Sequence, residues 1–576
     1  EEIEPGPVDE YLEVIDIDPA SGAAYQPIDL NDRALLAEDG LERLESDPQF
    51  HQLMVYAVAR KTIRHFEQAL GRVAVWAPRR LRWQQENAAG EDETAFHNQF
   101  VRRLRIYPHA LREANAYYSP DKKALLFGYC NATDDVNLAG GNLPGGLVFT
   151  CLSYDIVAHE TSHALLDGLH RRYIEATNPD MLAFHEAFSD IVALFQHFTH
   201  PEALKHQIAR TRGRLDLPNE LADLAKQFGQ ALGERQSLRT AIDMIKVEGT
   251  DEKRVKRLDD VGDEPHDRGA ILVAAVFEAF VEIYKARSQD LIRIATQGTG
   301  ELSVGAIHPD LVDRLANEAS KAAGHVLRMV VRALDYCPPV SITFGDFLRA
   351  MVTGDYALEP IDPYGYRVAL VSAFRRRRIY PEGVLSLSPE SLKWEHPEAL
   401  VFNIQEGLDK LELGWKLKTD RRDAFHKSRR DAGILRNWLD EEFATELGDL
   451  REENIELLGF SLRTKGRGGK TNLSPFEVHS VRPARRIGLD GQELRDVIIE
   501  ITQRSWARGR HSLRGGATWI IDGETGNIRY CVRKRVDNPW RIRQEARFME
   551  DREGLAANYF DGSADAEPFA IAHRGG

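Results

Sequence analysis

One short run of residues constrains this chain more than any other: His-Glu-Thr-Ser-His at positions 159–163. Apolar residues surround the run at helical spacing, so we expect it to lie on an amphipathic helix. Residues four apart share one face of a helix, and His159 and His163 can therefore direct both imidazoles at one ion. Glu160 follows the first histidine and can reach a water beside that ion without being a ligand itself.

A second amphipathic stretch, residues 181–198, carries two acidic side chains four apart, Glu186 and Asp190. Glu186 would supply a third metal ligand from a separate helix, and three protein ligands leave one coordination position open, as catalytic zinc requires. Asp190 is spaced to brace a ligand histidine. The plainer interpretation is two histidines satisfied in the core and a surface carboxylate. The order of ligands, base and bracing acid favours a zinc peptidase.

The composition is that of a globular protein without a membrane span. The 576 residues are 43% apolar and 29% charged, and no apolar run reaches the roughly 18 residues that a span needs. The net charge of −15 argues against a general nucleic-acid binder. Four cysteines, at positions 130, 151, 337 and 531, are widely separated, which argues against a disulfide framework and against a cysteine-based metal site. The acidic first residues differ from a secretory signal, so we expect a cytoplasmic protein.

The order of predicted elements divides the chain into four parts. We expect an extended segment at 1–34, a β-rich lobe at 35–153, a helical lobe with the metal motif at 154–385, and helices followed by antiparallel sheet at 386–576. Single strands are expected at 73–76, 104–107, 124–129 and 146–150, and hairpins at 477–502 and 518–534. The predicted fold class is therefore α+β, with the site in the cleft between the two lobes.

These motifs resemble those of the thermolysin-like metallopeptidases, also called gluzincins. The match is H-E-x-x-H followed on the next helix by E-A-x-S-D, here residues 159–163 and 186–190. The resemblance covers roughly residues 70–380 and implies a two-lobed zincin unit with a β-rich N-lobe and an α-helical C-lobe. It also implies that His159, His163 and Glu186 bind one Zn²⁺. Glu160 would be the general base, and Asp190 would brace His159.

Further segments match the same family in chain order. Asn115 and Ala116 are similar to the edge-strand segment that holds the substrate peptide. His266 is similar to the catalytic histidine that stabilises the oxyanion, Tyr173 to the tyrosine that assists it, and Arg239 to an arginine that contacts the substrate carbonyl. Taken singly, these residues would be interpreted as turn, loop or surface positions. Only their placement relative to the zinc motif distinguishes them.

The sequence also departs from the family. Asp155 matches a calcium ligand, but the paired glutamate falls on His197 and the acidic cluster beyond it is missing, so structural calcium is disfavoured. His185 replaces the asparagine that usually precedes the third ligand, and we expect the brace on His163 to differ. The resemblance implies nothing about residues 390–576.

The expected function is hydrolysis of peptide bonds by an intracellular zinc endopeptidase acting on a protein or peptide. One alternative is a catalytically weak zincin scaffold that acts as a binding or sensor module through its C-terminal region. A zinc aminopeptidase is a weaker alternative, because the sequence lacks a Gly-x-Met-Glu-Asn segment to capture a free N-terminus. Residues 461–550 hold 19 Lys or Arg against 10 Asp or Glu, a balance that would suit nucleic acid. A solvated sheet face packed against the acidic catalytic lobe is the favoured interpretation of that excess.

Overall fold

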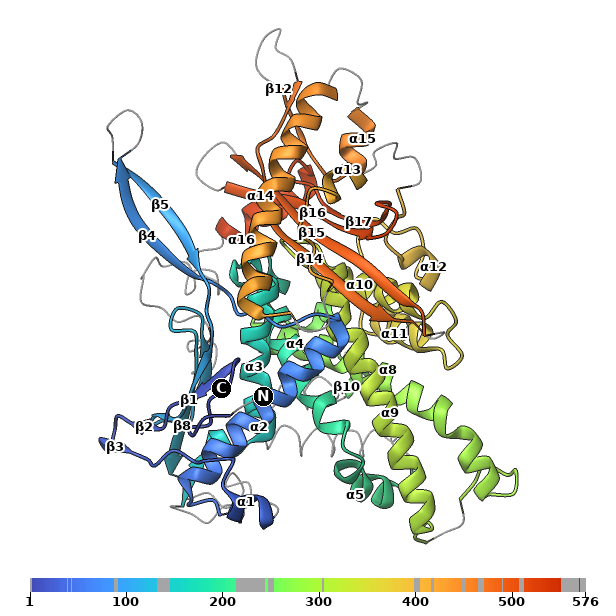
Figure 1. Cartoon of the computed structure of the whole chain (residues 1–576). Coiled ribbons are helices and arrows are strands. Elements are labelled where there is room, and N and C mark those ends of the chain that lie inside the picture. The colour runs from blue at the N-terminus through green and yellow to red at the C-terminus, as the bar shows by residue number, and fades with distance from the viewer. Residues whose placement is uncertain are drawn as a thin grey trace.

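The computed structural model has a mixed α+β fold whose C-terminal sheet is antiparallel, as the sequence predicts (Figure 1). The structure describes residues 3–38, 40–42, 44–86, 92–131, 146–213, 244–246, 253–302, 305–397, 404–415, 419–446, 452–464, 471–488, 491–506, 512–550 and 569.

The N-terminal part contains a five-stranded mixed sheet. Its strands are β1 (Leu12–Val14), β6 (Leu104–Leu111), β7 (Ala116–Ser119), β8 (Ala124–Asn131) and β9 (Leu147–Phe149). They follow the order β1-β6-β8-β7, with β9 also paired to β8. The pairs β1–β6 and β6–β8 are parallel, whereas β7 and β9 run antiparallel to β8. The strand β7 comes last in this order, and it contacts the helix that bears the zinc motif.

Two expectations for this part were incomplete or wrong. Residues 1–34 are not merely extended, because they supply β1 and the short pair β2 (Ile17–Asp18) and β3 (Ala23–Ala24). The strand expected at 73–76 is wrong. Trp76 is buried, and its indole N–H donates to the Tyr11 carbonyl at 3.0 Å, so the apolar pattern there serves burial rather than strand pairing. Figure 1 also shows a long projecting hairpin, β4 (Arg79–Glu86) and β5 (Asp92–Gln99).

Helices make up the middle of the chain. The long ones are α2 (Pro48–Leu70), α3 (Tyr154–Leu169), α4 (Pro179–Phe198), α8 (Pro265–Ala295) and α9 (Pro309–Ala333). The shorter elements are α1 (Arg33–Ala37), η1 (Thr150–Leu152), η2 (Arg171–Ile174), α5 (Pro201–Thr211), β10 (Met244–Lys246), β11 (Lys253–Val255), η3 (Leu258–Asp260), η4 (Leu334–Tyr336), α10 (Phe344–Leu358), α11 (Tyr366–Arg376) and α12 (Pro389–Leu392). The apolar faces of the long helices meet in one continuous core. None of the described helices combines the length and the apolar composition that crossing a membrane requires.

Local capping fixes where the site helices begin. The Ser153 hydroxyl accepts the Ile156 N–H at the start of α3, and the Asn178 side chain accepts the Asp180 N–H at 2.8 Å at the start of α4. Helix α8 packs closely on α4, because a β-carbon at Gly269 would lie 2.9 Å from the Ala183 carbonyl oxygen. These contacts bring the first turn of α8 beside the acidic residues of α4.

The C-terminal part joins helices to an antiparallel sheet of four strands in chain order. The elements are α13 (Gln405–Leu408), α14 (Arg421–Glu446), α15 (Glu452–Leu457), β12 (Leu462–Thr464), β13 (Thr471–Leu473), β14 (Phe476–Ile487), β15 (Glu493–Trp506), β16 (Ser512–Asp522), β17 (Ile528–Lys534) and α16 (Pro539–Glu550). Both expected hairpins are confirmed, as β14–β15 and β16–β17. Helix α14 lies across the sheet, and Trp519 is fully buried in the core beneath it.

The C-terminal sheet is tied to the helical part by buried ion pairs. Asp335 in η4 binds Arg72 bidentately, at 2.6 and 2.8 Å, and also contacts Arg486 of β14. Arg486 in turn donates to Asp496 at 2.9 Å, and Arg482 pairs with Glu500 of β15. The arginines of β14 therefore bond within the protein. The contact of Arg486 with Asp335 agrees with the expected packing of this sheet face, but Arg486 is buried rather than solvated.

Candidate metal centre

Two neighbouring helices bring the predicted ligands together. Helix α3 carries His159 and His163, and α4 carries Glu186. The Nε2 atoms of the two histidines lie 2.9 Å apart, and Glu186 Oε2 lies 3.4 Å from the first and 3.7 Å from the second. All three side chains are buried, and one ligand atom from each lies within 4.8 Å of the others. The geometry can hold one metal ion.

The contact made by His159 Nδ1, the ring nitrogen turned away from the ligand group, determines whether Nε2 carries a proton or a lone pair. Asp190 Oδ1 lies 2.8 Å from His159 Nδ1. A carboxylate only accepts, so the Nδ1 proton points at Asp190 and the Nε2 lone pair points at the site. This is the brace that the resemblance implies for Asp190.

His163 has a different brace. Its Nδ1 lies 3.1 Å from His185 Nδ1 and 3.2 Å from the Ser189 hydroxyl, so its Nε2 is again turned toward the site. Burial lowers the pKa of both His163 and His185, which favours neutral imidazoles. The sequence pointed to His185 as a departure but gave no role for it, and Ser189 went unnoticed. Ser189 lies four residues after His185, so helical spacing could have identified the pair.

Glu160 is wholly buried and turned toward the same space. Its Oε2 accepts the Tyr118 N–H of β7 at 2.9 Å, and its Oε1 lies 4.0 Å from His159 Nε2. The carboxylate is thus fixed by strand β7 beside the ligand group, close enough to take a proton from a water there but outside the set of three ligands.

His266 joins the group from the first turn of α8. Its Nε2 lies 3.4 Å from Glu186 Oε2, and its Nδ1 lies 3.0 Å from Glu264 Oε1. Glu264 also caps α8 by accepting the Asp267 N–H at 2.6 Å. It is a positioning residue that sequence reasoning missed, although an acid just before a helix is a recognisable cap. The imidazole is directed at the site and keeps some exposure to solvent.

Asn115 and Ala116 lie where β7 begins, on the strand that fixes Glu160. The Asn115 side chain is 5% exposed, and neither its amide oxygen nor its amide nitrogen has a hydrogen-bond partner among the described residues. A buried amide without partners is costly, so this side chain is suited to bonding a ligand.

Two predicted residues do not join the group. Tyr173 is fully buried in η2, stacked on His170 with ring centroids 4.5 Å apart, and its hydroxyl donates to the Pro338 carbonyl at 2.6 Å. The structure therefore does not bring its hydroxyl to His266. The prediction used the number of residues between His163 and Tyr173, but Tyr173 lies in a separate 3₁₀ turn after the end of α3. Arg239 lies outside the described residues.

A side chain from the end of the sequence lies against the ligands. The ring of Phe569 packs on the ring of His163 with centroids 4.4 Å apart, and on His185 at 5.1 Å. It also approaches the ring of Tyr118 at 6.1 Å and is only 2% exposed. No local sequence signal could have placed this residue at the site.

Asp155, which matches a calcium ligand of the family, contacts a histidine. Asp155 Oδ1 lies 3.2 Å from His197 Nδ1, the residue that takes the place of the family's glutamate. A separate cavity of about 1010 Å³ lies between α2, α14 and β14, and none of the metal ligands lines it.

No protein-family model matches the chain, and no curated protein is significantly similar to it. The functional assignment therefore depends on the geometry of the site.

Proposed function

We propose that the protein is a zinc-dependent endopeptidase of the thermolysin-like, or gluzincin, type, with a β-rich lobe and a helical lobe flanking the site. One observation carries the proposal: the Nε2 atoms of His159 and His163 lie 2.9 Å apart with Glu186 beside them. A cation held by these three side chains would balance the carboxylate charge and accept the Nε2 lone pair that Asp190 directs at the site. Two imidazoles and one carboxylate form a donor set that catalytic zinc uses.

The remaining residues supply the steps of hydrolysis. When bound, zinc supplies a Lewis acid that polarises the substrate carbonyl and acidifies a neighbouring water. Glu160, held by the Tyr118 N–H, takes the proton from the attacking water and delivers it to the leaving amine. His266, protonated on both ring nitrogens and oriented by the contact of Nδ1 with Glu264, would donate from Nε2 to the oxygen on which negative charge develops.

Strand β7 suits an extended peptide as the substrate. It ends the order of the N-terminal sheet, and it fixes the general base through Tyr118. The buried Asn115 amide at its start can bond the backbone of a peptide lying alongside. Recognition of a backbone does not depend on a free terminus, which favours cleavage within a chain.

Metal removal tests the proposal directly. A peptide blocked at both ends should be cleaved by the protein, cleavage should stop after dialysis against a chelator, and stoichiometric Zn²⁺ should restore it. The far-ultraviolet circular dichroism of the chelated protein serves as the control for folding. Cleavage that survives complete loss of metal, or that occurs only with free amino termini, would contradict the proposal.

Phe569 provides a second test of the same site. Its ring covers His163, and burying a phenyl side chain contributes roughly 1.5–3 kcal/mol. Replacing it with alanine should lower the free energy of unfolding by about that amount, measured as a shift of the urea midpoint. Phe569→Tyr keeps the ring and should stay near the wild-type value. An unchanged midpoint in Phe569→Ala would contradict the packing of this ring on His163.

A further inference from the structure

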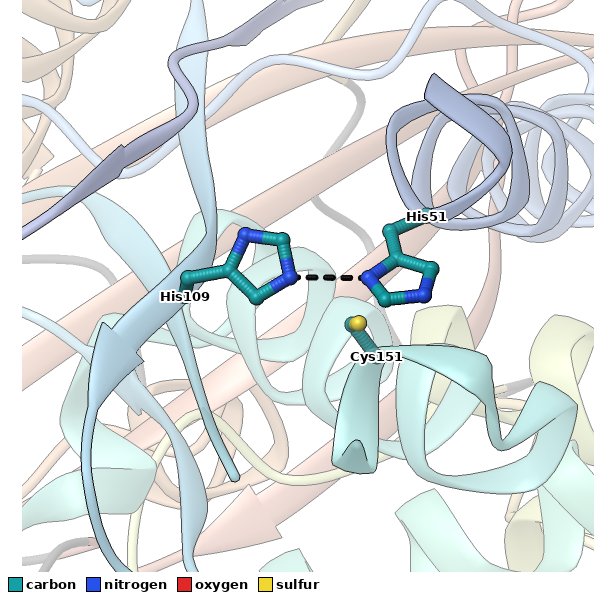
Figure 2. Close-up of side chains that lie close together, drawn as sticks. All are labelled: His51, His109 and Cys151. Carbon is teal, nitrogen blue, oxygen red and sulfur yellow. Dashed lines mark hydrogen bonds between the residues drawn. The ribbon is translucent and has the colours of Figure 1, made fainter. Parts of the chain in front are cut away.

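A second group of side chains that could bind a metal lies near the start of α3. His51 of α2, His109 of β6 and Cys151 of η1 come from three distant parts of the sequence, and all three are at least 98% buried. One ligand atom from each lies within 4.8 Å of the others. Figure 2 shows the two imidazoles facing each other with the Cys151 sulfur beside the space between them.

Each imidazole has one nitrogen turned away from this space, and the partner of that outer nitrogen determines where the ring proton lies. His109 Nδ1 lies 2.6 Å from Asp16 Oδ1, and His51 Nε2 lies 2.8 Å from the Glu45 carbonyl oxygen. A carboxylate and a carbonyl oxygen both accept, so each outer nitrogen carries the proton. The inner nitrogens, His51 Nδ1 and His109 Nε2, therefore both present lone pairs, and they lie 2.8 Å apart.

Two buried lone pairs at that distance repel each other unless a positive charge lies between them. Either a metal ion or a proton shared by the two histidines would supply this charge. A shared proton needs no third ligand, whereas a metal ion does, and the Cys151 thiol lies in position to be that ligand. The outer contacts, one to a carboxylate and one to a backbone carbonyl, are the ones that orient metal-ligating histidines in proteins. Imidazole and thiolate together suit zinc.

We propose that His51, His109 and Cys151 bind a second zinc ion, distinct from the ion of the α3–α4 group. Binding releases the Cys151 thiol proton to solvent, and the thiolate and two neutral imidazoles occupy three of the four positions. Asp16 stays outside the ligand set, because its second oxygen accepts from Gln52 at 2.8 Å. A water can take the fourth position.

The role that this ion fits is structural. It lies among aromatic rings, with Phe149 at 4.6 Å from the His51 ring and Tyr25 at 5.1 Å from the His109 ring, centroid to centroid. It would join α2, the five-stranded N-terminal sheet and η1, and Cys151 precedes the first residue of α3 by only three positions. The ion would fix the start of the helix that carries His159 and His163.

A third candidate group makes a useful contrast. His325, Asp355 and Glu359 also lie within metal-binding distance of one another. There Asp355 already pairs with Arg367 at 2.6 Å, and the histidine and the glutamate remain partly exposed. The charge of Asp355 is neutralised by Arg367 without an ion, so this group serves as a negative control.

Cobalt substitution tests the second site without any reference to peptidase activity. A Co²⁺ ion bound to a thiolate gives a sulfur-to-metal charge-transfer absorption in the near ultraviolet, and the α3–α4 group contains no sulfur. The apoprotein of the full chain, titrated with Co²⁺ alone, should develop this absorption. The absorption should vanish in Cys151→Ser. Cys337→Ser should keep it, since Cys337 is equally buried but its sulfur contacts the Ala333 carbonyl.

Metal analysis of the proteins purified with zinc gives the second measurement. The wild type should hold one more zinc ion per chain than Cys151→Ser, and His325→Ala should match the wild type. This difference of one ion is expected even if the α3–α4 group binds none, so the two proposals can fail separately. Wild-type protein without the charge-transfer absorption would overturn the second site and would indicate a proton held on His109. Absorption that persists in Cys151→Ser would overturn it as well.

Discussion

Replacing Glu160 with glutamine is expected to lower kcat for a blocked peptide by about 10²–10⁴-fold, the usual contribution of a general base. Glutamine has the same shape and can still accept the Tyr118 N–H through its amide oxygen, so the side chain should keep its place. What it loses is the ability to take a proton. Because Glu160 lies outside the three ligands, the zinc content should remain that of the wild type.

The measurement pairs steady-state kinetics with metal analysis of the same samples. Asp155→Asn is a suitable control, because Asp155 is another buried acid on α3 that contacts His197 rather than the metal group. Its activity should be close to wild type. Undiminished turnover in Glu160→Gln would refute the assignment of the base, whereas loss of zinc would show that Glu160 acts as a ligand.

Removing the carboxylate of Asp335 is expected to cause the largest loss of stability. Asp335 is 1% exposed and lies between the guanidinium groups of Arg72 and Arg486. Breaking a buried ion pair from one side leaves uncompensated charge and costs about 3–5 kcal/mol. We therefore expect Asp335→Ala to lower the free energy of unfolding by that amount, measured as the shift of the urea midpoint with the slope held constant.

An exposed ion pair and the dependence on pH provide the comparison. Arg378→Ala breaks a surface contact with Asp259 and should change the same free energy by less than about 1 kcal/mol.

Burial alone would raise the pKa of Asp335, but the charges of Arg72 and Arg486 lower it from 3.8 to about 2. The stabilisation is therefore complete above about pH 4 and is lost as pH falls toward 2. A wild-type midpoint that stays level between these values would contradict this account.

Helical periodicity was sufficient to predict the α3–α4 group. His159 and His163 share a face because they are four apart, as are Glu186 and Asp190, and two consecutive helices brought the faces together. Asn115 and His266 have no such local signal, and they were predicted only through the family resemblance. Local signals also decided which strands were predicted correctly. The two hairpins have clear turns and were predicted, whereas residues 73–76 have the pattern of a strand but no partner strand.

Contacts between distant parts of the sequence could not be predicted. Cys151 was judged an isolated cysteine, since nothing in its neighbourhood indicates His51 or His109, which reach it only through the packing of α2 and β6. Phe569 reaches His163 from the far end of the chain. Tyr173 shows the converse case: its spacing after the zinc motif suggested a place beside His266, and the structure places its hydroxyl on the Pro338 carbonyl.

The contacts of the C-terminal sheet determine the smallest part of the chain that can fold independently. Ile520 and Val532, from β16 and β17, belong to the same hydrophobic core as the site helices, and the Arg485 N–H donates to the Gly71 carbonyl at 3.1 Å. Cutting the chain after residue 385 would leave Asp335 without Arg486 and open that core to water. A shortened form of this protein that keeps the metal-bearing helices therefore also needs the C-terminal sheet.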